Sequence, residues 1–374
     1  MSARTWNRRV PPRHEVGTRW VIRFTHVRSE LLTVQERSHA DRGVPSAGLG
    51  TSYADKGRET SMKLIVQPDS GISPVLLAIR RARKSIDILI FRSDIQDVRK
   101  ALAQAVSRGV TVRALIAHTN HGGGKNLRKL ELALLESGVI VARTSDDLVR
   151  YHGKMMIVDG RLLHVYGFNF THLDVDRSRS FGIVTRHGRF VQEAQKLFDA
   201  DFARQAYRAT CDRFIVSPEN ARERLCAFVK STKKQLLIYD PKVSDTLALR
   251  CLAERAKAGV DIRIIGKVAG RAAGLSAEPY PGKRLHVRTI IQDGRRAFLG
   301  SQSLRKAELD HRREVGVIID DKRVVQELVS VFENDWALTK TAKKEAEASA
   351  EKEKERKTEK DGKSVEEARV AVGA

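Results

Sequence analysis

Apolar and polar residues follow one another along the chain in a way that predicts alternating helices and strands. Residues 85–91 (SIDILIF) and 110–117 (VTVRALIA) are apolar runs of strand length. Residues 76–84 and 98–109 instead carry apolar side chains at helical spacing, and the second of these patterns ends at a glycine. Such alternation is typical of an α/β fold, in which helices cover the faces of a sheet.

The same order of elements returns in the second half of the chain. Helical patterns at 222–234 and 245–259 alternate with strand patterns at 235–240 and 260–266, all 150 residues after their counterparts. We therefore predict two copies of one α/β unit. We assign residues 62–208 to the first repeat, 209–339 to the second, 340–374 to a charged Lys/Glu/Ala tail, and 1–61 to a non-periodic extension.

Each repeat contains one H-x-[K/R]-x4-D segment. The first is YHGKMMIVD and the second is LHVRTIIQD, at a constant offset of 134 residues. His and the cation two residues later are expected on the same side of a strand. The paired positions are His152 and His286, Lys154 and Arg288, Asp159 and Asp293, Asn169 and Ser303, Ser180 and Glu314, and Gly182 and Gly316.

The offset changes from 150 to 134 because the first copy has sixteen extra residues between Gly109 and His152. They include the segment HTNHGGGKNLRKLELALLESG, for which we predict a glycine loop and an extra helix at about 126–137, ending at Gly138. His118, His121 and the three glycines before Lys125 could form a phosphate cradle. Their spacing fits no phosphate-loop signature, which favours a mobile connector.

Residues 1–61 combine scattered arginines with turn formers and show no periodicity, so we expect disorder there. An alternative is that translation starts at Met62, where the ordered pattern begins. The arginines are not followed by an apolar segment of the kind found in secretory signals.

The chain has 374 residues and a formal net charge of +23, of which +17 lies within residues 62–339. A basic folded body favours an anionic partner, either nucleic acid or an anionic lipid surface. The alternative is a merely solvated basic surface. Aromatic residues make up 6% of the chain, which argues against a stacking platform for single-stranded nucleic acid.

Cys211, Cys226 and Cys251 form no C-x-x-C pair, which indicates a reducing compartment and no zinc site. We expect the three thiols to be buried in the core. No apolar run approaches the ~20 residues that span a bilayer. We expect a soluble, cytoplasmic protein without a transmembrane segment, open to peripheral membrane contact.

The paired motif suits chemistry at a phosphodiester. One neutral histidine can attack phosphorus while a second, protonated one gives a proton to the leaving oxygen. Lys154 and Arg288 would hold the non-bridging oxygens, and Asn169 would add a neutral donor.

These motifs resemble those of the phospholipase D superfamily over roughly residues 64–337. The resemblance implies two repeats, each a mixed β-sheet flanked by helices, packed pseudo-symmetrically around one active site. It also implies a covalent phosphohistidine on His152, acid and base catalysis by His286, and no cofactor. An acidic residue downstream in one repeat orients the histidine of the other in that family. Glu314 matches this position and Ser180 does not, which favours His152 as the nucleophile.

The second copy departs from the family pattern. It has Arg288 in place of lysine and Ser303 in place of asparagine, while the first copy has Gly167-Phe168-Asn169 where the family has G-S-x-N. Each replacement keeps a charge or a hydrogen-bond donor, so we expect Arg288 and Ser303 to bind the substrate phosphate as well. Together they leave open a weakened second half-site.

Asp159 and Asp293 stand where each strand enters an Asp-Gly turn, so we expect them to cap turns or pair with arginines. A metal site at the histidines is disfavoured by the neighbouring cations.

Three functions remain: a phospholipase D-type enzyme that hydrolyses or transfers a phosphatidyl group, a metal-independent nuclease, and a phosphate-binding protein with weakened catalysis. The resemblance favours the lipid enzyme.

Overall fold

The computed structural model describes residues 62–341 apart from 119–123, 271–274 and 276, together with Lys343, Lys344 and Glu347. The predictions for 1–61, for His121 with its neighbouring glycines, and for most of the charged tail therefore lie outside the described residues. Within the described residues, no helix has the length and apolar character needed to cross a membrane.

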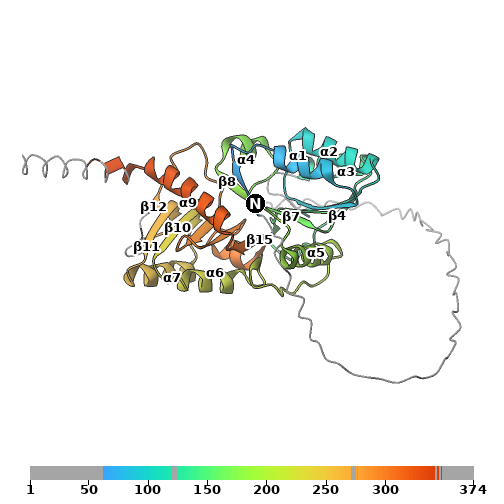
Figure 1. Cartoon of the computed structure of the whole chain (residues 1–374). Coiled ribbons are helices and arrows are strands. Elements are labelled where there is room, and N and C mark those ends of the chain that lie inside the picture. Colours follow the sequence, from blue (N-terminus) through green and yellow to red (C-terminus); the bar gives the residue numbers. More distant parts are fainter. Residues whose placement is uncertain are drawn as a thin grey trace, which may run out of the picture. The chain divides into compact units, whose positions relative to one another are not determined.

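The first repeat is built on a seven-stranded mixed sheet (Figure 1). β2 and β3 run parallel, whereas β6, β7 and β8 form an antiparallel meander. In sheet order the strands are β1 (Lys63–Gln67), β8 (Ser180–Thr185), β7 (Leu162–Tyr166), β6 (Met155–Val158), β2 (Ser85–Ile90), β3 (Thr111–Ile116) and β4 (Ile140–Arg143). Its helices are α1 (Ser73–Arg81), α2 (Gln96–Ser107), α3 (Gly124–Glu136), α4 (His172–Arg177) and α5 (Gly188–Phe202).

The second repeat forms an eight-stranded sheet with the same inner order. Its strands are β12 (Ala277–Glu278), β11 (Asp261–Val268), β10 (Gln235–Val243), β13 (Thr289–Gln292), β14 (Arg296–Gly300), β15 (Arg312–Ile319) and β5 (Arg150–Tyr151), with β9 (Phe214–Ser217) also paired to β15. Its helices are α6 (Ala221–Lys230), α7 (Thr246–Lys257), α8 (Lys306–Asp310) and α9 (Lys322–Ala337).

The predicted strands and helices are present with shifts of a few residues at their ends. Gly109, Gly138 and Gly259 follow α2, α3 and α7 with φ of 82°, 76° and 82°, which is the left-handed conformation that ends helices. The added helix of the insertion is α3. One expectation was wrong: His152 to Lys154 and His286 to Arg288 are not in strands, since β6 and β13 begin only after the cation.

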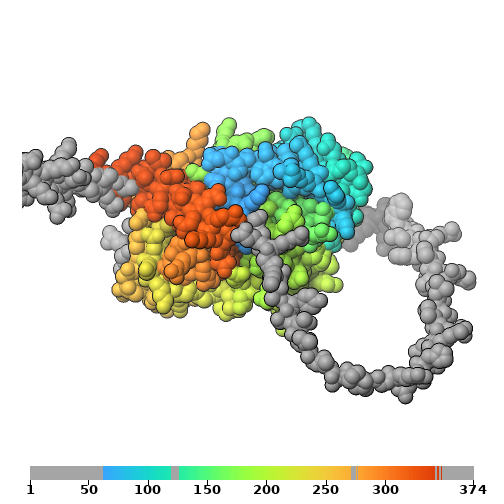
Figure 2. Space-filling model, in the orientation of Figure 1, coloured from blue at the N-terminus to red at the C-terminus, as the bar shows by residue number. Residues whose placement is uncertain are grey.

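The two sheets share a core. One cluster of buried residues combines side chains of both sheets with α5 and α9, including Phe190, Phe198 and Phe332. Two further clusters lie under α1 to α3 in the first repeat and under α6 and α7 in the second. In Figure 2 the orange and red surface of α9 lies against the blue surface of the first repeat, where α9 contacts β1.

Backbone pairing also crosses between the repeats. The first-repeat strand β5 pairs in parallel with the start of β15, joining Arg150 to Arg312. Arg179 of the first repeat forms a reciprocal parallel bridge with Leu285 of the second. Both bridges lie immediately before a motif histidine, so the two motifs meet where the repeats pack together.

Candidate active site

Each motif histidine is held by the backbone of the opposite repeat. The amide of His152 donates to the carbonyl of Arg313 at 2.7 Å, and the amide of His286 donates to the carbonyl of Arg179 at 3.0 Å. Arg313 and Arg179 are themselves equivalent in the two repeats. Arg313 immediately precedes Glu314, and Arg179 immediately precedes Ser180, which is the equivalent residue of the first repeat.

His152 lies between a carboxylate and an ammonium group. Its Nδ1 is 2.9 Å from Oε2 and 3.0 Å from Oε1 of the buried Glu314, while its Nε2 is 3.0 Å from Nζ of Lys154. A carboxylate accepts and an ammonium donates, so Nδ1 carries the proton and Nε2 presents its lone pair. The ring of Phe91 packs edge-on at 4.6 Å between centroids and fixes the imidazole plane.

His286 also faces a carboxylate of the opposite repeat, and here the sequence prediction was incomplete. Nδ1 of His286 lies 3.4 Å from Oδ2 of Asp174, which is buried. Ser180, the equivalent of Glu314, uses its hydroxyl to donate to the carbonyl of His286 at 3.1 Å. Glu314 is therefore not the only carboxylate at the site, and its presence alone does not make the site asymmetric.

A signal for Asp174 was present in the sequence. Asp174 and Glu308 obey the same offset of 134, each five residues after Asn169 or Ser303. In both repeats this carboxylate accepts a hydrogen bond from the backbone amide of the Asn or Ser, at 2.8 Å. Only the contact across the repeats, which sequence spacing does not contain, connects Asp174 with His286.

The two motif cations adopt equivalent positions. Lys154 is 1% exposed, and its ammonium donates to the carbonyl of His152. Arg288 donates through Nη1 to the carbonyl of His286 at 3.2 Å. Nε of Arg288 is buried and has no hydrogen-bond partner among the described residues, although it lies 3.9 Å from Oε2 of Glu308.

Asn169 and Ser303 differ in what they can offer a substrate. Nδ2 of Asn169 donates one hydrogen to Asp174 at 2.7 Å and keeps a second hydrogen. The only hydroxyl donor of Ser303 is engaged by Asp240, and the same oxygen lies 3.2 Å from the carbonyl of Lys242. The prediction that Ser303 binds substrate phosphate therefore finds no free donor in this geometry.

Comparison with known proteins gives the family of the chain. The family model described as cardiolipin synthase, PLD-like domain, matches residues 75–202 and 225–336, one segment in each repeat. The chain belongs to the phospholipase D superfamily.

Individual relatives are distant. A cardiolipin synthase of Staphylococcus aureus strain Mu50 is 25% identical over 239 residues, covering 51% of this chain and 47% of the relative. The chain thus spans about half the length of the curated relatives it matches. Among solved structures, polyphosphate kinase from Porphyromonas gingivalis aligns with a TM-score of 0.61 at 17% identity, over 73% of this chain and 50% of that one. Phosphatidylserine synthase from Haemophilus influenzae aligns with a TM-score of 0.57 at 11% identity, over 74% and 85%. Because both sequence identities are below 20%, these two alignments show a similar fold and nothing about activity.

Burial sets the protonation of this phospholipase D-type site. Burial, with the neighbouring Lys154 and Arg288, places the pKa of His152 well below its ordinary value, and burial with Arg288 does the same for His286. Burial also lowers the pKa of Lys154 to about 7. The site therefore disfavours positive charge until an anion enters, and a phosphate would restore the proton to one imidazole.

The two carboxylates respond differently to their surroundings. Burial raises the pKa of Glu314 against the opposing effect of Lys154. Burial likewise opposes ionisation of Asp174, but His286, the Asn169 amide and Arg284 outweigh it and lower the pKa of Asp174 to about 2. Asp174 thus stays ionised beside His286 throughout the neutral range.

The motif aspartates lie at the far ends of the strands and cap loops. The carboxylate of Asp159 accepts from the amides of Arg83, Lys84 and Ser85 at 3.0, 2.7 and 3.1 Å. Asp293 accepts from the corresponding amides of the second repeat, Lys233, Lys234 and Gln235, at 3.1, 2.7 and 2.9 Å. Both residues have φ of 53° at the start of an Asp-Gly hairpin turn.

Among the described residues, neither His118 nor the three cysteines form a hydrogen bond or ion pair with the motif histidines. The backbone of His118 is tied to Thr144, and the other residues of the glycine loop lie outside the described region or have no described side chain. Cys211, Cys226 and Cys251 are free thiols. Within the described residues, no cluster of three or more His, Cys, Asp or Glu side chains is arranged to hold a metal ion. A cavity of about 430 Å³ borders Phe91 and is lined in part by Arg92, Arg99 and Lys129.

Proposed function

We propose that this protein is a phosphatidyltransferase of the phospholipase D type, which moves a phosphatidyl group from a phospholipid to an alcohol or to water. The observation that carries the proposal is the crossed pairing of His152 with Glu314 and of His286 with Asp174. This pairing brings two imidazoles and two buried cations to one place, which would supply a nucleophile, a general acid and charge neutralisation.

In the first step Nε2 of His152 attacks phosphorus and forms the N–P bond. The P–O bond to the leaving alcohol breaks, and that oxygen takes the proton from His286. Lys154 must leave Nε2 of His152 for the attack, and a non-bridging phosphate oxygen is the better acceptor for its ammonium. Nε of Arg288 and the second amide hydrogen of Asn169 would contact the remaining anionic oxygen.

In the second step His286, now neutral, removes the proton from an incoming alcohol or water. The oxygen attacks phosphorus, the N–P bond breaks, and His152 returns to its neutral form. The products are the transferred or hydrolysed phosphatidyl group and a reprotonated His286. Every proton taken in one step is returned in the other, as a ping-pong reaction requires.

The roles of the two histidines follow from their partners. Glu314 contacts Nδ1 of His152 with both oxygens and pairs with no arginine among the described residues, so its charge is available for the imidazolium-like state that develops on attack. Asp174 remains ionised and supports a protonated His286 once substrate is bound. We infer that His152 is the nucleophile and His286 the acid and base.

The choice of a lipid substrate rests on the family model, described as a cardiolipin synthase domain, and on the curated relatives named cardiolipin synthase. A nuclease is the second candidate, because the net charge of +17 on residues 62–339 suits nucleic acid as well as anionic lipid.

One assay panel separates these functions. The protein and its His152→Ala variant are incubated with phosphatidylglycerol, phosphatidylcholine, and single- and double-stranded DNA. Turnover of a phospholipid that disappears in the variant supports the proposal. Cleavage of DNA alone, lost in the variant, would replace it with the nuclease, and binding without turnover of any of them would indicate the weakened phosphate-binding protein.

A further inference from the structure

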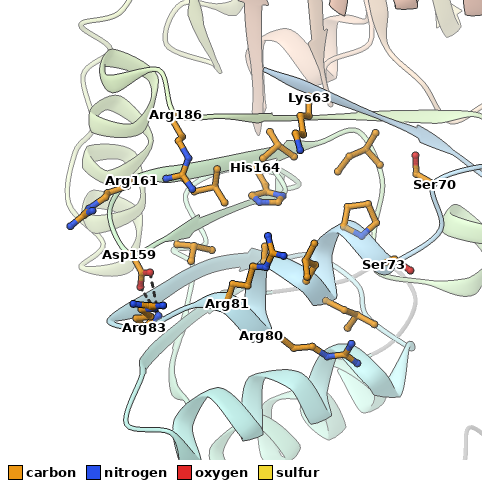
Figure 3. Close-up of a pocket in the computed structure, with 18 of the residues that line it drawn as sticks. Lys63, Ser70, Ser73, Arg80, Arg81, Arg83, Asp159, Arg161, His164 and Arg186 are labelled. Atoms are coloured by element: carbon orange, nitrogen blue, oxygen red, sulfur yellow. Dashed lines mark hydrogen bonds between the residues drawn. The ribbon is translucent and has the colours of Figure 1, made fainter. Parts of the chain in front are cut away.

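A second, larger cavity lies away from the motif histidines, on the first repeat (Figure 3). It has a volume of about 1160 Å³ and opens between α1 and the strands β1, β8, β7 and β6. That volume lies slightly above the range of roughly 300–1,000 Å³ that is usual for pockets that hold small ligands. Its floor is apolar and includes Leu64, Leu76, Leu77, Val158, Leu162 and Val184.

Basic side chains surround this floor. Figure 3 labels six of them, Lys63, Arg80, Arg81, Arg83, Arg161 and Arg186. Within the described part of the chain, none of the six is in an ion pair with a carboxylate. The carboxylate on this rim, Asp159, accepts from three backbone amides. Among the described residues, the rim therefore carries a net positive charge that would attract an anion.

His164 is a buried polar residue in the wall of the cavity. Its side chain is 2% exposed and lies between Lys63 and Arg81 in Figure 3. Neither ring nitrogen has a hydrogen-bond partner among the described residues, which is costly for a buried polar group. Burial lowers the pKa of His164 to about 3, so the ring is neutral.

The second repeat carries larger side chains at the corresponding positions, which makes it an internal comparison. Phe228 stands at the position of Ala78 and Phe298 at that of His164, and both phenylalanines belong to the buried core. Arg296, equivalent to Leu162, stacks on Phe228 at 5.1 Å.

The rim of the second repeat is also closed. Arg213, equivalent to Lys63, pairs at 2.7 Å with Asp320, equivalent to Arg186. The first repeat has small, polar and like-charged residues where the second has aromatic residues and an ion pair.

We propose that this cavity binds one anionic phospholipid of a bilayer, with an acyl chain on the apolar floor and the phosphate among the rim cations. The argument is chemical complementarity: a nucleic acid would use the cations but not a floor of leucine and valine, and a neutral apolar ligand would leave the cations unmatched. The site goes beyond the proposed catalytic function, since it would dock the protein on its membrane and leave the phosphodiester chemistry to the histidines.

The test measures binding and not turnover, so it stands apart from the proposed function. The full chain carrying His152→Ala is floated with phosphatidylcholine vesicles containing phosphatidylglycerol. Ala78→Phe/His164→Phe introduces the residues of the second repeat and keeps every rim charge. Filling the cavity should weaken binding by at least about tenfold, because the buried methylene groups of the acyl chain lose their place.

A second pair of variants separates the rim from general surface charge. Arg80→Gln/Arg161→Gln removes two rim cations, and Lys230→Gln/Arg295→Gln removes the two exposed cations at equivalent positions of the second repeat. We expect the rim pair to lose about 30-fold in affinity and the control pair less than about threefold.

Each other outcome overturns the proposal. Unchanged vesicle binding by a folded cavity-filled variant would exclude a lipid in the cavity. Equal losses in the rim and control pairs would indicate general attraction to the surface. Loss of binding to an oligonucleotide in the rim pair, with vesicle binding intact, would assign the cations to nucleic acid. If circular dichroism shows that the cavity-filled variant does not fold, the comparison of the rim pair with the control pair still tests whether the rim cations bind the lipid.

Discussion

Oε2 of Glu314, in the second repeat, lies 2.9 Å from Nδ1 of His152 in the first. The reciprocal contact, from Asp174 of the first repeat to Nδ1 of His286 in the second, measures 3.4 Å. Among the described residues, neither histidine is in an ion pair with a carboxylate of its own repeat. The candidate active site therefore lies where the two repeats pack together, and we expect each carboxylate to act through the histidine it faces.

Removing either carboxylate charge should impair a different half of the reaction. Glu314→Gln should reduce kcat by about a thousandfold on all substrates, because the charge that supports attack by His152 is lost. Asp174→Asn should reduce kcat on an alkyl diester far more than on a 4-nitrophenyl diester, whose leaving group needs no proton. Steady-state kinetics on both substrates measures this. Asp176→Asn, in the same helix but exposed, is the control and should keep its activity; equal effects of Asp174→Asn on the two substrates would contradict the acid role of His286.

The pKa of Lys154 predicts how substrate binding depends on pH. With a pKa of about 7, the ammonium of the free enzyme loses its proton as the pH rises through neutrality, so the attraction for phosphate weakens. KM should rise between about pH 7 and 9. Lys154→Arg, which introduces the residue of the second motif, keeps its charge in this range and should flatten the rise. A wild-type KM that is constant up to about pH 9 would show that Lys154 does not bind the substrate.

The motif aspartates should matter for stability and not for chemistry. Asp159→Asn and Asp293→Asn each weaken hydrogen bonds from three backbone amides to a charged acceptor, at a cost of about 2 kcal/mol in unfolding free energy. Backbone amides lower the pKa of both carboxylates despite opposition from burial, so this contribution is present above the ordinary aspartate pKa and is lost as the pH falls. Urea unfolding and activity per folded molecule measure the two effects. Lost activity with unchanged stability would place these residues in the mechanism.

The cations beside the histidines predict resistance to chelators. Nζ of Lys154 lies 3.0 Å from Nε2 of His152, where it would repel a divalent ion bound to that nitrogen. Activity should therefore survive prolonged dialysis against EDTA, with a zinc-dependent phosphodiesterase as the positive control. Loss of all turnover that is restored by a divalent metal would contradict the two-histidine mechanism.

Much of the fold could be predicted from the sequence because its signals are local. The apolar runs that became β2, β3 and β10, and Gly109 and Gly259 after the helices, depend on neighbouring residues alone. The constant offset of 134 residues likewise identifies the repeat and both motif histidines by sequence spacing. Periodicity failed at His152 to Lys154, since cross-repeat hydrogen bonds and not strand pairing hold that segment.

The site could be predicted only in part because its contacts cross between the repeats. Sequence spacing shows that Asp174 and Glu308 are equivalent, but not that Asp174 faces His286 while arginines surround Glu308. The loss of Ser303 as a donor depends on Asp240, which is distant in sequence. The cavity of the first repeat depends in turn on what Ala78 and His164 leave unfilled beside residues of four strands.

Locating the phosphohistidine intermediate on the chain tests the proposed mechanism most directly. His286→Ala and His152→Ala are mixed with a phosphorus-labelled 4-nitrophenyl diester, whose leaving group departs without a general acid. The denatured proteins are then digested and their peptides sequenced. We predict an acid-labile label on the peptide containing His152 in His286→Ala, and no label in His152→Ala. A label on the peptide containing His286, or a labelled His152→Ala protein, would contradict the assignment of His152 as the nucleophile.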